Sequence, residues 1–383
     1  MAWTPNRISD LAGRVALVTI CSAATVLLSL SVAGCSRASR EPLHLRTSAS
    51  DYRSLGLTPG KVQQWEDGRR TAPDEKSFEW WYFDALMKDG TAVVVVFSDN
   101  FAQDHKRGVS LELTSPDGKH RTFNTKFDEP GAFAKDHTFV QIGENRFEGD
   151  LDTYSIKVSA DNPQHLGVDL VLKRRFPSFR AATGQLSSGP AYFAWLNAVP
   201  SGAVTGTITI GGKATAASGE GYHDHNWGNV PPSDLLDKWW WGRASVGQHR
   251  IVTYEIHGKK SVGGTNIGLY YVGTEEGIEV NAVGDQVAVL EGPLIKHPDP
   301  NHERPIPASI SYAANGTTSN FSISGPMLLS LDLMAEQPSS AKLLASVFGI
   351  KPRYSRFQSP VSLSVAGRPI EKGTGILEYY ELQ

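Results

Sequence analysis

The chain has 383 residues, of which 20% are charged and 40% hydrophobic, and its formal net charge at pH 7 is −3. These values are ordinary for a folded globular protein and argue against a disordered or fibrous chain. The near-neutral balance, without a long basic cluster, offers no surface that would attract a phosphate backbone, so no nucleic acid is expected as a partner.

The first 34 residues have the pattern of an export signal. Arg7 and Arg14 precede an apolar run that ends in small residues just before Cys35. A basic, then apolar, then small-residue order is typical of a secretory signal peptide, although the apolar run is also close to the length of a membrane anchor. We therefore expect residues 1–34 to be a signal peptide and the protein to be exported.

Residues 32–35, Val-Ala-Gly-Cys, resemble a bacterial lipobox, in which the cysteine becomes the lipid-bearing first residue of the mature chain. In a bacterium, Cys35 would then be lipidated and attach the protein to a membrane. Two glycosylation sequons, at Asn315 and Asn320, keep a eukaryotic secretory route open. The other cysteine, Cys21, would leave with the signal, so neither a disulfide framework nor a cysteine-ligated zinc is expected.

The remaining sequence predicts a linker (residues 35–74) followed by many short strands. Most of the runs alternate apolar and polar residues, and Asp-Gly or Gly-Gly pairs stand at hairpin positions, such as Gly211-Gly212. The pattern predicts an all-β fold with two barrel or sandwich domains packed together, residues 75–215 and residues 216–383. In chain order, the expected strands include 91–97, 108–113, 154–158, 168–172, 204–210, 250–256, 267–272, 286–290, 309–312 and 375–380, with short helices near 233–238 and 341–347.

Residues 79–84 read Glu-Trp-Trp-Tyr-Phe-Asp, four aromatics between two carboxylates. In a strand, Glu79 and Trp81 share one face while Tyr82 and Asp84 share the other. One face must therefore carry a carboxylate inward. The segment is either a core strand with solvated acidic ends or the wall of a pocket.

Residues 219–228, Gly-Glu-Gly-Tyr-His-Asp-His-Asn-Trp-Gly, are the strongest local signal. In an extended chain, His223, His225 and Trp227 point one way and Asp224 the other. The histidines could ligate a metal, but no third ligand stands at a diagnostic spacing. They could instead belong to a structural polar network, or act as acid/base or hydrogen-bonding groups in a ligand pocket. We favour the pocket and expect no metal.

Residues 239–243, Trp-Trp-Trp-Gly-Arg, place three indoles in succession. Side chains alternate along a strand, so at least one indole should line a cavity or an inter-domain seam. If the next run pairs with this one, Tyr254 and Glu255 bring a phenol and a carboxylate close to the indoles. No P-loop, dinucleotide-binding glycine pattern or serine nucleophile elbow is present in a suitable setting.

Together with the closing residues 373–378, these motifs resemble the carotenoid 1,2-hydratase (hydroxyneurosporene synthase) superfamily, whose relatives include fungal lipocalin-like Diels-Alderases. The resemblance implies two lipocalin-like β-domains that hold an apolar polyene or terpenoid-like substrate at or near their interface, with no cofactor. For the hydratase branch it implies acid catalysis by His225, Trp227 and Tyr254. The aspartate of that branch is replaced here by Ile256, and Glu255 should face the opposite side.

Residues 226–228 and 241–243 resemble the Diels-Alderase branch more closely. We therefore expect a cofactor-independent cyclase or isomerase acting on an apolar polyene, polyketide or terpenoid, in which the pocket holds the reacting groups together and a donor polarises a carbonyl. The alternatives are a hydratase or dehydratase of an isoprenoid double bond and a non-catalytic lipid-binding lipoprotein. The candidate residues are His225, Asp224, Glu79 and Tyr254 for catalysis, and Trp81, Tyr82, His223, Trp227, Trp239 and Trp241 for substrate binding.

Overall fold

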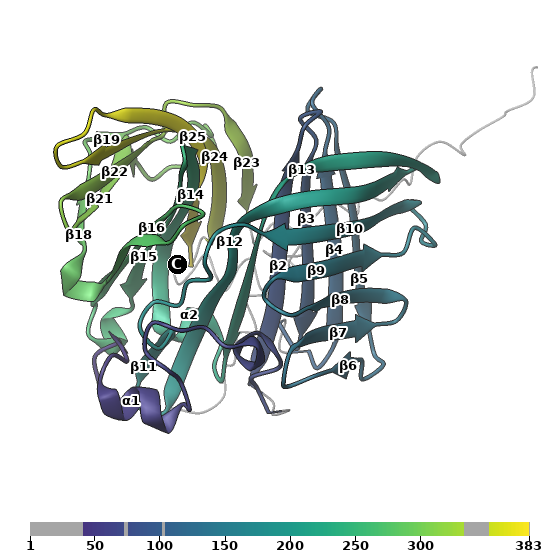
Figure 1. Cartoon of the computed structure of the whole chain (residues 1–383), viewed down its shortest axis with the longest axis horizontal. Coiled ribbons are helices and arrows are strands. Elements are labelled where there is room, and N and C mark those ends of the chain that lie inside the picture. The colour runs from purple at the N-terminus through teal and green to yellow at the C-terminus, as the bar shows by residue number, and fades with distance from the viewer. Residues whose placement is uncertain (1–40, 73–75, 102–103, 333–351, 383) are drawn as a thin grey trace, which may run out of the picture.

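The computed structural model describes residues 41–72, 76–101, 104–332 and 352–382 (Figure 1). The expected signal peptide, Cys35 and the expected helix near 341–347 lie outside the described residues. The expected all-β fold is confirmed, since two curled antiparallel sheets lie side by side and helices are few and short (Figure 1). No helix within the described ranges is long and apolar enough to cross a membrane.

The N-terminal sheet has thirteen strands, and its main path runs β5-β4-β3-β2-β13-β12-β10-β9-β8-β7-β6. Strand β11 pairs with β12, and β1 pairs with β11. The strands are β1 (His44–Leu45), β2 (Phe78–Met87), β3 (Ala92–Asp99), β4 (Arg107–Thr114), β5 (His120–Phe127), β6 (Ala132–Phe133), β7 (Thr138–Ile142), β8 (Asn145–Gly149), β9 (Thr153–Val158), β10 (Leu166–Arg174), β11 (Gln185–Ser188), β12 (Ala191–Ile210) and β13 (Lys213–Gly228).

The C-terminal sheet has ten strands in the order β17-β16-β15-β14-β25-β24-β22-β21-β18, with β23 beside β24. Its strands are β14 (Leu236–Val246), β15 (His249–Gly258), β16 (Asn266–Gly273), β17 (Ile278–Val283), β18 (Ala288–Glu291), β21 (Ser309–Ala314), β22 (Thr317–Ser322), β23 (Met327–Asp332), β24 (Arg353–Val365) and β25 (Glu371–Glu381). A separate two-stranded sheet contains β19 (Leu294–Ile295) and β20 (Ile306–Pro307).

The helices are short. They are α1 (Ala49–Ser54) and α2 (Pro232–Leu235), with 3-10 turns at Gln64–Asp67, Lys260–Val262 and Gly284–Gln286. The helix expected near 233–238 ends at Leu235, because from Leu236 the chain joins the C-terminal sheet as β14.

The chain passes from the N-terminal to the C-terminal sheet after the expected domain boundary at residues 215 and 216, as the β12–β13 hairpin shows. Gly211 and Gly212 both have positive φ, as a tight two-residue hairpin turn requires, and they join β12 to β13. Strand β13 then pairs with β2 along its second half. The expected boundary therefore lies inside β13, and the chain leaves the N-terminal sheet only at residues 229–235.

The described part of the expected linker is folded rather than extended. Leu43 is fully buried, and Glu66 and Asp67 are buried although both are acidic. Glu66 is paired with the buried Arg180, and Asp67 accepts hydrogen bonds from the N-terminal sheet. The polar composition that suggested a linker thus comes partly from residues that form buried polar contacts.

Three apolar cores organise the molecule. One lies inside the curl of the N-terminal sheet and one inside the C-terminal sheet, while the third lies between the sheets. Strands β2, β13, β14 and β15 contribute to two cores each, because alternate side chains point to opposite faces. The third core contains the candidate site.

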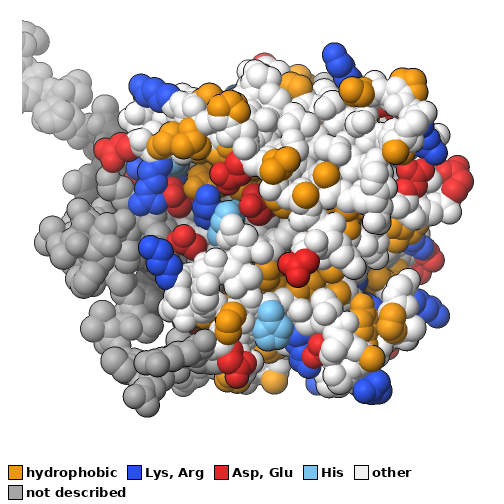
Figure 2. Space-filling model, turned by 90° about the vertical axis from the view of Figure 1, so that its left-hand side faces the viewer, with side chains coloured by type: hydrophobic (Ala, Val, Ile, Leu, Met, Phe, Trp, Pro, Cys, Tyr) orange, Lys and Arg blue, Asp and Glu red, His pale blue; other side chains and the backbone are white. Residues whose placement is uncertain are grey.

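The outer surface differs from these aromatic interiors. On the face seen in Figure 2, hydrophobic side chains are scattered among acidic and basic ones. Scattered apolar residues are normal for a protein surface and indicate no particular partner.

Candidate functional site: an aromatic cleft between the sheets

A cleft between the two sheets is lined mainly by aromatic side chains and has a volume of about 110 Å³. This is of the same order as the roughly 150 Å³ apolar cavity known to hold a benzene ring. Its lining therefore suits a ring or a conjugated segment of a small apolar molecule. The lining residues are Trp80, Tyr82, Val96, Phe101, Trp195, Asp224, Asn226, Pro232, Trp239, Trp241, Tyr254, Tyr354, Glu378 and Tyr380.

Asp224 places a buried carboxyl group in this apolar cleft. Trp195 Nε1 donates to its Oδ2 at 3.0 Å, and the Tyr222 hydroxyl donates to the same oxygen at 2.8 Å. Asn226 Nδ2 donates to Oδ1 at 2.8 Å. Burial raises the pKa of Asp224 to about 6, although these three hydrogen bonds oppose the shift. The cleft therefore contains a group that can exchange a proton under mildly acidic conditions.

Asp84 joins the two sheets next to the cleft, beside its lining residues Tyr82 and Glu378. It belongs to β2, and it pairs with Arg243 of β14 and at 3.3 Å with Arg356 of β24. The Tyr82 hydroxyl also donates to Asp84, at 3.0 Å. Arg356 Nε lies 3.5 Å from Glu378 Oε1, and burial raises the pKa of Glu378. These ion pairs hold the walls of the cleft in register, since each partner is largely shielded from water.

Trp241 lines the cleft and carries a buried hydrogen-bond donor. The residue is 6% exposed, and its indole Nε1 has no hydrogen-bond partner among the described residues. A buried N–H group without a partner is costly unless a ligand or water accepts its proton. Tyr254, which is paired with Trp241 in the β14–β15 ladder, lines the same cleft.

The two histidines lie in the N-terminal core, on the other face of β13. His223 Nε2 is 3.0 Å from Asp67 Oδ2, and His223 Nδ1 is 2.8 Å from the carbonyl oxygen of Tyr82. Both ring nitrogens face oxygen acceptors, so the ring donates from both and is positively charged. Accordingly, Asp67 raises the pKa of His223 despite burial, and the pKa of Asp67 is lowered.

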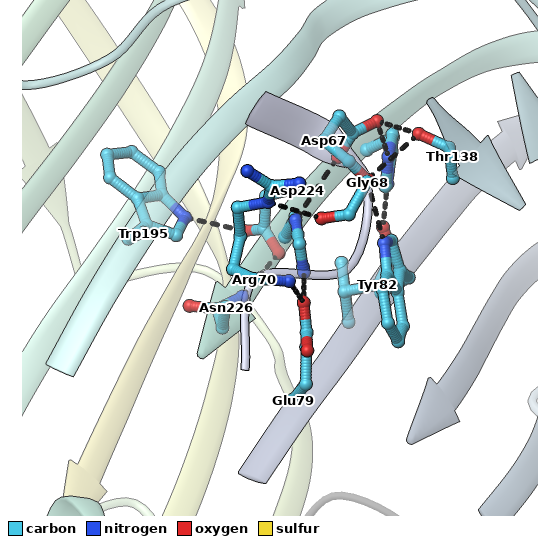
Figure 3. A network of polar contacts seen from close by, with 12 residues as sticks. Asp67, Gly68, Arg70, Glu79, Tyr82, Thr138, Trp195, Asp224 and Asn226 are labelled. Carbon is cyan, nitrogen blue, oxygen red and sulfur yellow. Dashed lines mark hydrogen bonds and ion pairs between the residues drawn. The ribbon is translucent and has the colours of Figure 1, made fainter. Parts of the chain in front are cut away.

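His225 and Glu79 form the second half of this buried network. His225 Nε2 is 2.8 Å from Glu79 Oε1, and the His225 ring stacks on Trp81 at 4.6 Å between centroids. Glu79 also accepts from the backbone N–H groups of Arg70 and Thr71, at 2.6 Å and 3.1 Å. Figure 3 shows Glu79 beside Arg70 and Asp67 beside Thr138, with the Trp195–Asp224 contact nearby.

The structure thus divides the candidate residues predicted from sequence between two environments. Those that line the cleft are Asp224, Tyr254, Tyr82, Trp239 and Trp241. Those that do not line it, and lie in or against the N-terminal core, are His225, Glu79, Trp81, His223 and Trp227. Within this second group, His225, Glu79 and His223 form a buried polar network, and Trp81 and Trp227 pack on the His225 ring, so the geometry supports a structural role for them in place of the predicted contact with a ligand.

Sequence reasoning missed several residues of the cleft. Trp195 and Trp80 form part of its wall, and Tyr354 and Glu378 reach it from β24 and β25. Glu378 stands in the closing motif, but no local pattern indicated that it would face β2. Asp67 was missed in the other core, because a single aspartate in a polar stretch gives no signal of burial.

Comparison with known proteins agrees with the resemblance found in the motifs. No family model matches the chain. It is 26% identical over 246 residues to hydroxyneurosporene dehydrogenase of Chlorobaculum tepidum, covering 53% of this chain and 62% of the relative. It is 26% identical over 216 residues to the quinolone epoxide rearrangement protein asqO of Emericella nidulans, covering 48% and 55%. The chain spans little more than half the length of these curated relatives.

Solved structures share the fold. CghA superposes with a TM-score of 0.60 at 16% identity, covering 82% of this chain and 94% of CghA, and it has also been crystallised with Sch210972. Kievitone hydratase from Nectria haematococca superposes with a TM-score of 0.51 at 13% identity, covering 89% and 97%. A putative AttH from Nitrosomonas europaea superposes with a TM-score of 0.54 at 16% identity, covering 84% of this chain and 98% of that protein. The predicted resemblance is confirmed as distant homology and a shared fold.

Proposed function

We propose that the protein is a cofactor-independent cyclase or isomerase of the Diels-Alderase type, which acts on an apolar polyene, polyketide or terpenoid that carries a carbonyl group. The observation that carries this proposal is a mainly aromatic cleft in whose wall the indole N–H of Trp241 has no hydrogen-bond partner among the described residues. An apolar wall can hold a folded substrate with its reacting ends together, which lowers the entropic part of the barrier. A donor aimed at the carbonyl oxygen then polarises the reacting double bond.

Asp224 supports a second candidate, the hydration or dehydration of an isoprenoid double bond. A carboxyl group with a pKa of about 6 holds its proton more readily than an ordinary aspartate. It could protonate an alkene, and the surrounding aromatic rings would stabilise the resulting positive charge. Tyr254 lines the same cleft and could orient the attacking water.

The mass of the product separates these functions. Purified full-length protein would be incubated with an apolar extract of its source organism in water enriched in ¹⁸O, and products would be followed by mass spectrometry. Cyclisation or isomerisation gives a product with the mass of its substrate and no label. Hydration adds labelled water and overturns the cyclase proposal, whereas bound compounds returned unchanged would indicate a carrier.

The role of Trp241 is tested by binding. β-Ionone, a conjugated ketone, would be titrated against the wild type and Trp241→Phe, with the corresponding hydrocarbon as the matched ligand. Loss of one neutral hydrogen bond, about 1 kcal/mol, should weaken ketone binding roughly fivefold more than hydrocarbon binding. Trp239→Phe removes a similar ring whose contact with Tyr380 is a stack at 4.3 Å, so it controls for lost aromatic area. Equal losses for both ligands in Trp241→Phe would contradict the assignment.

A further inference from the structure

A cluster of three titratable side chains lies away from the cleft, in the C-terminal sheet. Glu255 and His257 are two positions apart on β15, so they share one face of the strand, opposite to the face that carries Tyr254. Glu291 is the last residue of β18. Strand β18 stands at the far end of the strand order from β15, so the curl of the sheet brings the three together.

The spacing of the three side chains suits one metal ion. One potential ligand atom from each residue lies within 4.8 Å of the other two. His257 Nε2 and Glu255 Oε1 are 3.2 Å apart. In a tetrahedral site with bonds of about 2.0–2.2 Å, the ligand atoms lie roughly 3.3–3.6 Å from one another. The Glu255–His257 pair already has about this spacing, and side-chain rotations that bring the three atoms closer by about 1 Å would complete the site.

Unpartnered polar atoms point to the same conclusion independently. Glu255 is only 5% exposed, and its Oε2 has no hydrogen-bond partner among the residues that the structure describes. His257 Nε2, which faces the Glu255 carboxylate, also has none within that part of the chain. Buried polar atoms are nearly always satisfied, so a buried carboxylate left open beside an imidazole favours an electropositive ligand at this position.

Lys238 competes for one of the ligands. Its Nζ is 3.7 Å from Glu291 Oε1, and the side chain is 29% exposed. A long, partly solvated side chain can move into water when an ion takes its place. An exposed ion pair of this kind contributes little to stability, so its loss would cost the protein little.

We propose that Glu255, His257 and Glu291 bind a divalent metal ion of the zinc class. One imidazole and two carboxylates are a donor set that Zn²⁺ accepts, with a fourth position left for water. The ion would tie β18 to β15 across the curl of the C-terminal sheet. Because the ligands face away from the cleft, the site stabilises the sheet and is separate from the chemistry proposed for the cleft.

Zinc titration of the full chain tests this proposal. Tag-free protein would be freed of metal with EDTA, dialysed, and titrated with Zn²⁺ at pH 7.5 by calorimetry, with thermal unfolding measured in parallel. We expect one ion per chain and a higher Tm on binding. Absence of stoichiometric binding would overturn the proposal.

Variants identify the ligands. His257→Ala and Glu255→Gln should each weaken Zn²⁺ binding at least about tenfold, since even the loss of an outer hydrogen-bonding partner costs that much. His44→Ala, at an exposed histidine in β1, is the matched control and should bind as the wild type does. Lys238→Met should bind Zn²⁺ more tightly, because the competing cation is gone, and it does not depend on the folding of the other variants. Equal affinity of His257→Ala and His44→Ala, or no gain in Lys238→Met, would refute the assignment.

Discussion

Replacing His225 by alanine should reduce stability rather than affect the cleft alone. The side chain is fully buried, it contacts Glu79 at 2.8 Å, and it stacks on Trp81. Removing the imidazole leaves the buried Glu79 carboxyl group short of a hydrogen bond, which costs about 3 kcal/mol. With a urea dependence of about 3 kcal/mol per M, the unfolding midpoint should fall by about 1 M or more.

Two measurements on the His225→Ala variant distinguish a structural role of His225 from a role in ligand binding. Urea unfolding followed by circular dichroism gives the stability of His225→Ala, and β-ionone titration without urea gives the affinity of the folded fraction. We expect a large loss of stability with ketone affinity changed less than about threefold, because His225 points into the N-terminal core.

The control is Tyr254→Phe, which removes one hydroxyl group from the lining of the cleft. It should change stability by about 1 kcal/mol or less while altering ketone affinity. A His225→Ala protein as stable as the wild type but unable to bind or convert ligand would refute the reasoning and restore the catalytic role predicted from sequence.

Two further predictions concern pH. Burial raises the pKa of Asp224, so the folded protein binds this proton more tightly than the unfolded chain does. The resulting contribution to stability is fully present below pH 3.8 and is lost as the pH rises through about 6. In a series of urea unfolding midpoints measured against pH, Asp224→Asn should remove this decline. For the Asp67–His223 pair, the lowered aspartate pKa contributes stability that is lost as the pH falls below 3.8, and the raised histidine pKa contributes stability that is lost as the pH rises beyond 6.5. Asp67→Asn should therefore lower the free energy of unfolding most between pH 3.8 and pH 6.5. If the difference in stability between this variant and the wild type does not vary with pH, Asp67 and His223 are not a charged pair.

Much of the fold could be predicted because strands carry a local signature. The ten runs expected as strands all overlap strands of the fold, and the Gly211-Gly212 turn forms the β12–β13 hairpin. The period of two also predicts that Asp224 faces away from His223 and His225, and this is confirmed, since Asp224 lines the cleft while both histidines contact the N-terminal core. The sequence did not predict that the described part of residues 35–74 is folded. Polar residues there, such as Glu66 and Asp67, become buried only through partners far along the chain.

The sequence by itself determined that the chain folds as sheets and which side chains share a face of each strand. Only the tertiary structure decided which face of β13 meets the cleft. Both faces of that strand are buried, one in the N-terminal core and one between the sheets, so burial periodicity is nearly the same for either choice. The ion pairs of Asp84 with Arg243 and Arg356 likewise depend on strands that meet only when the sheets pack together. The closeness of Glu255 and Glu291 depends in the same way on the curl of the C-terminal sheet, because the two residues are far apart in the sequence.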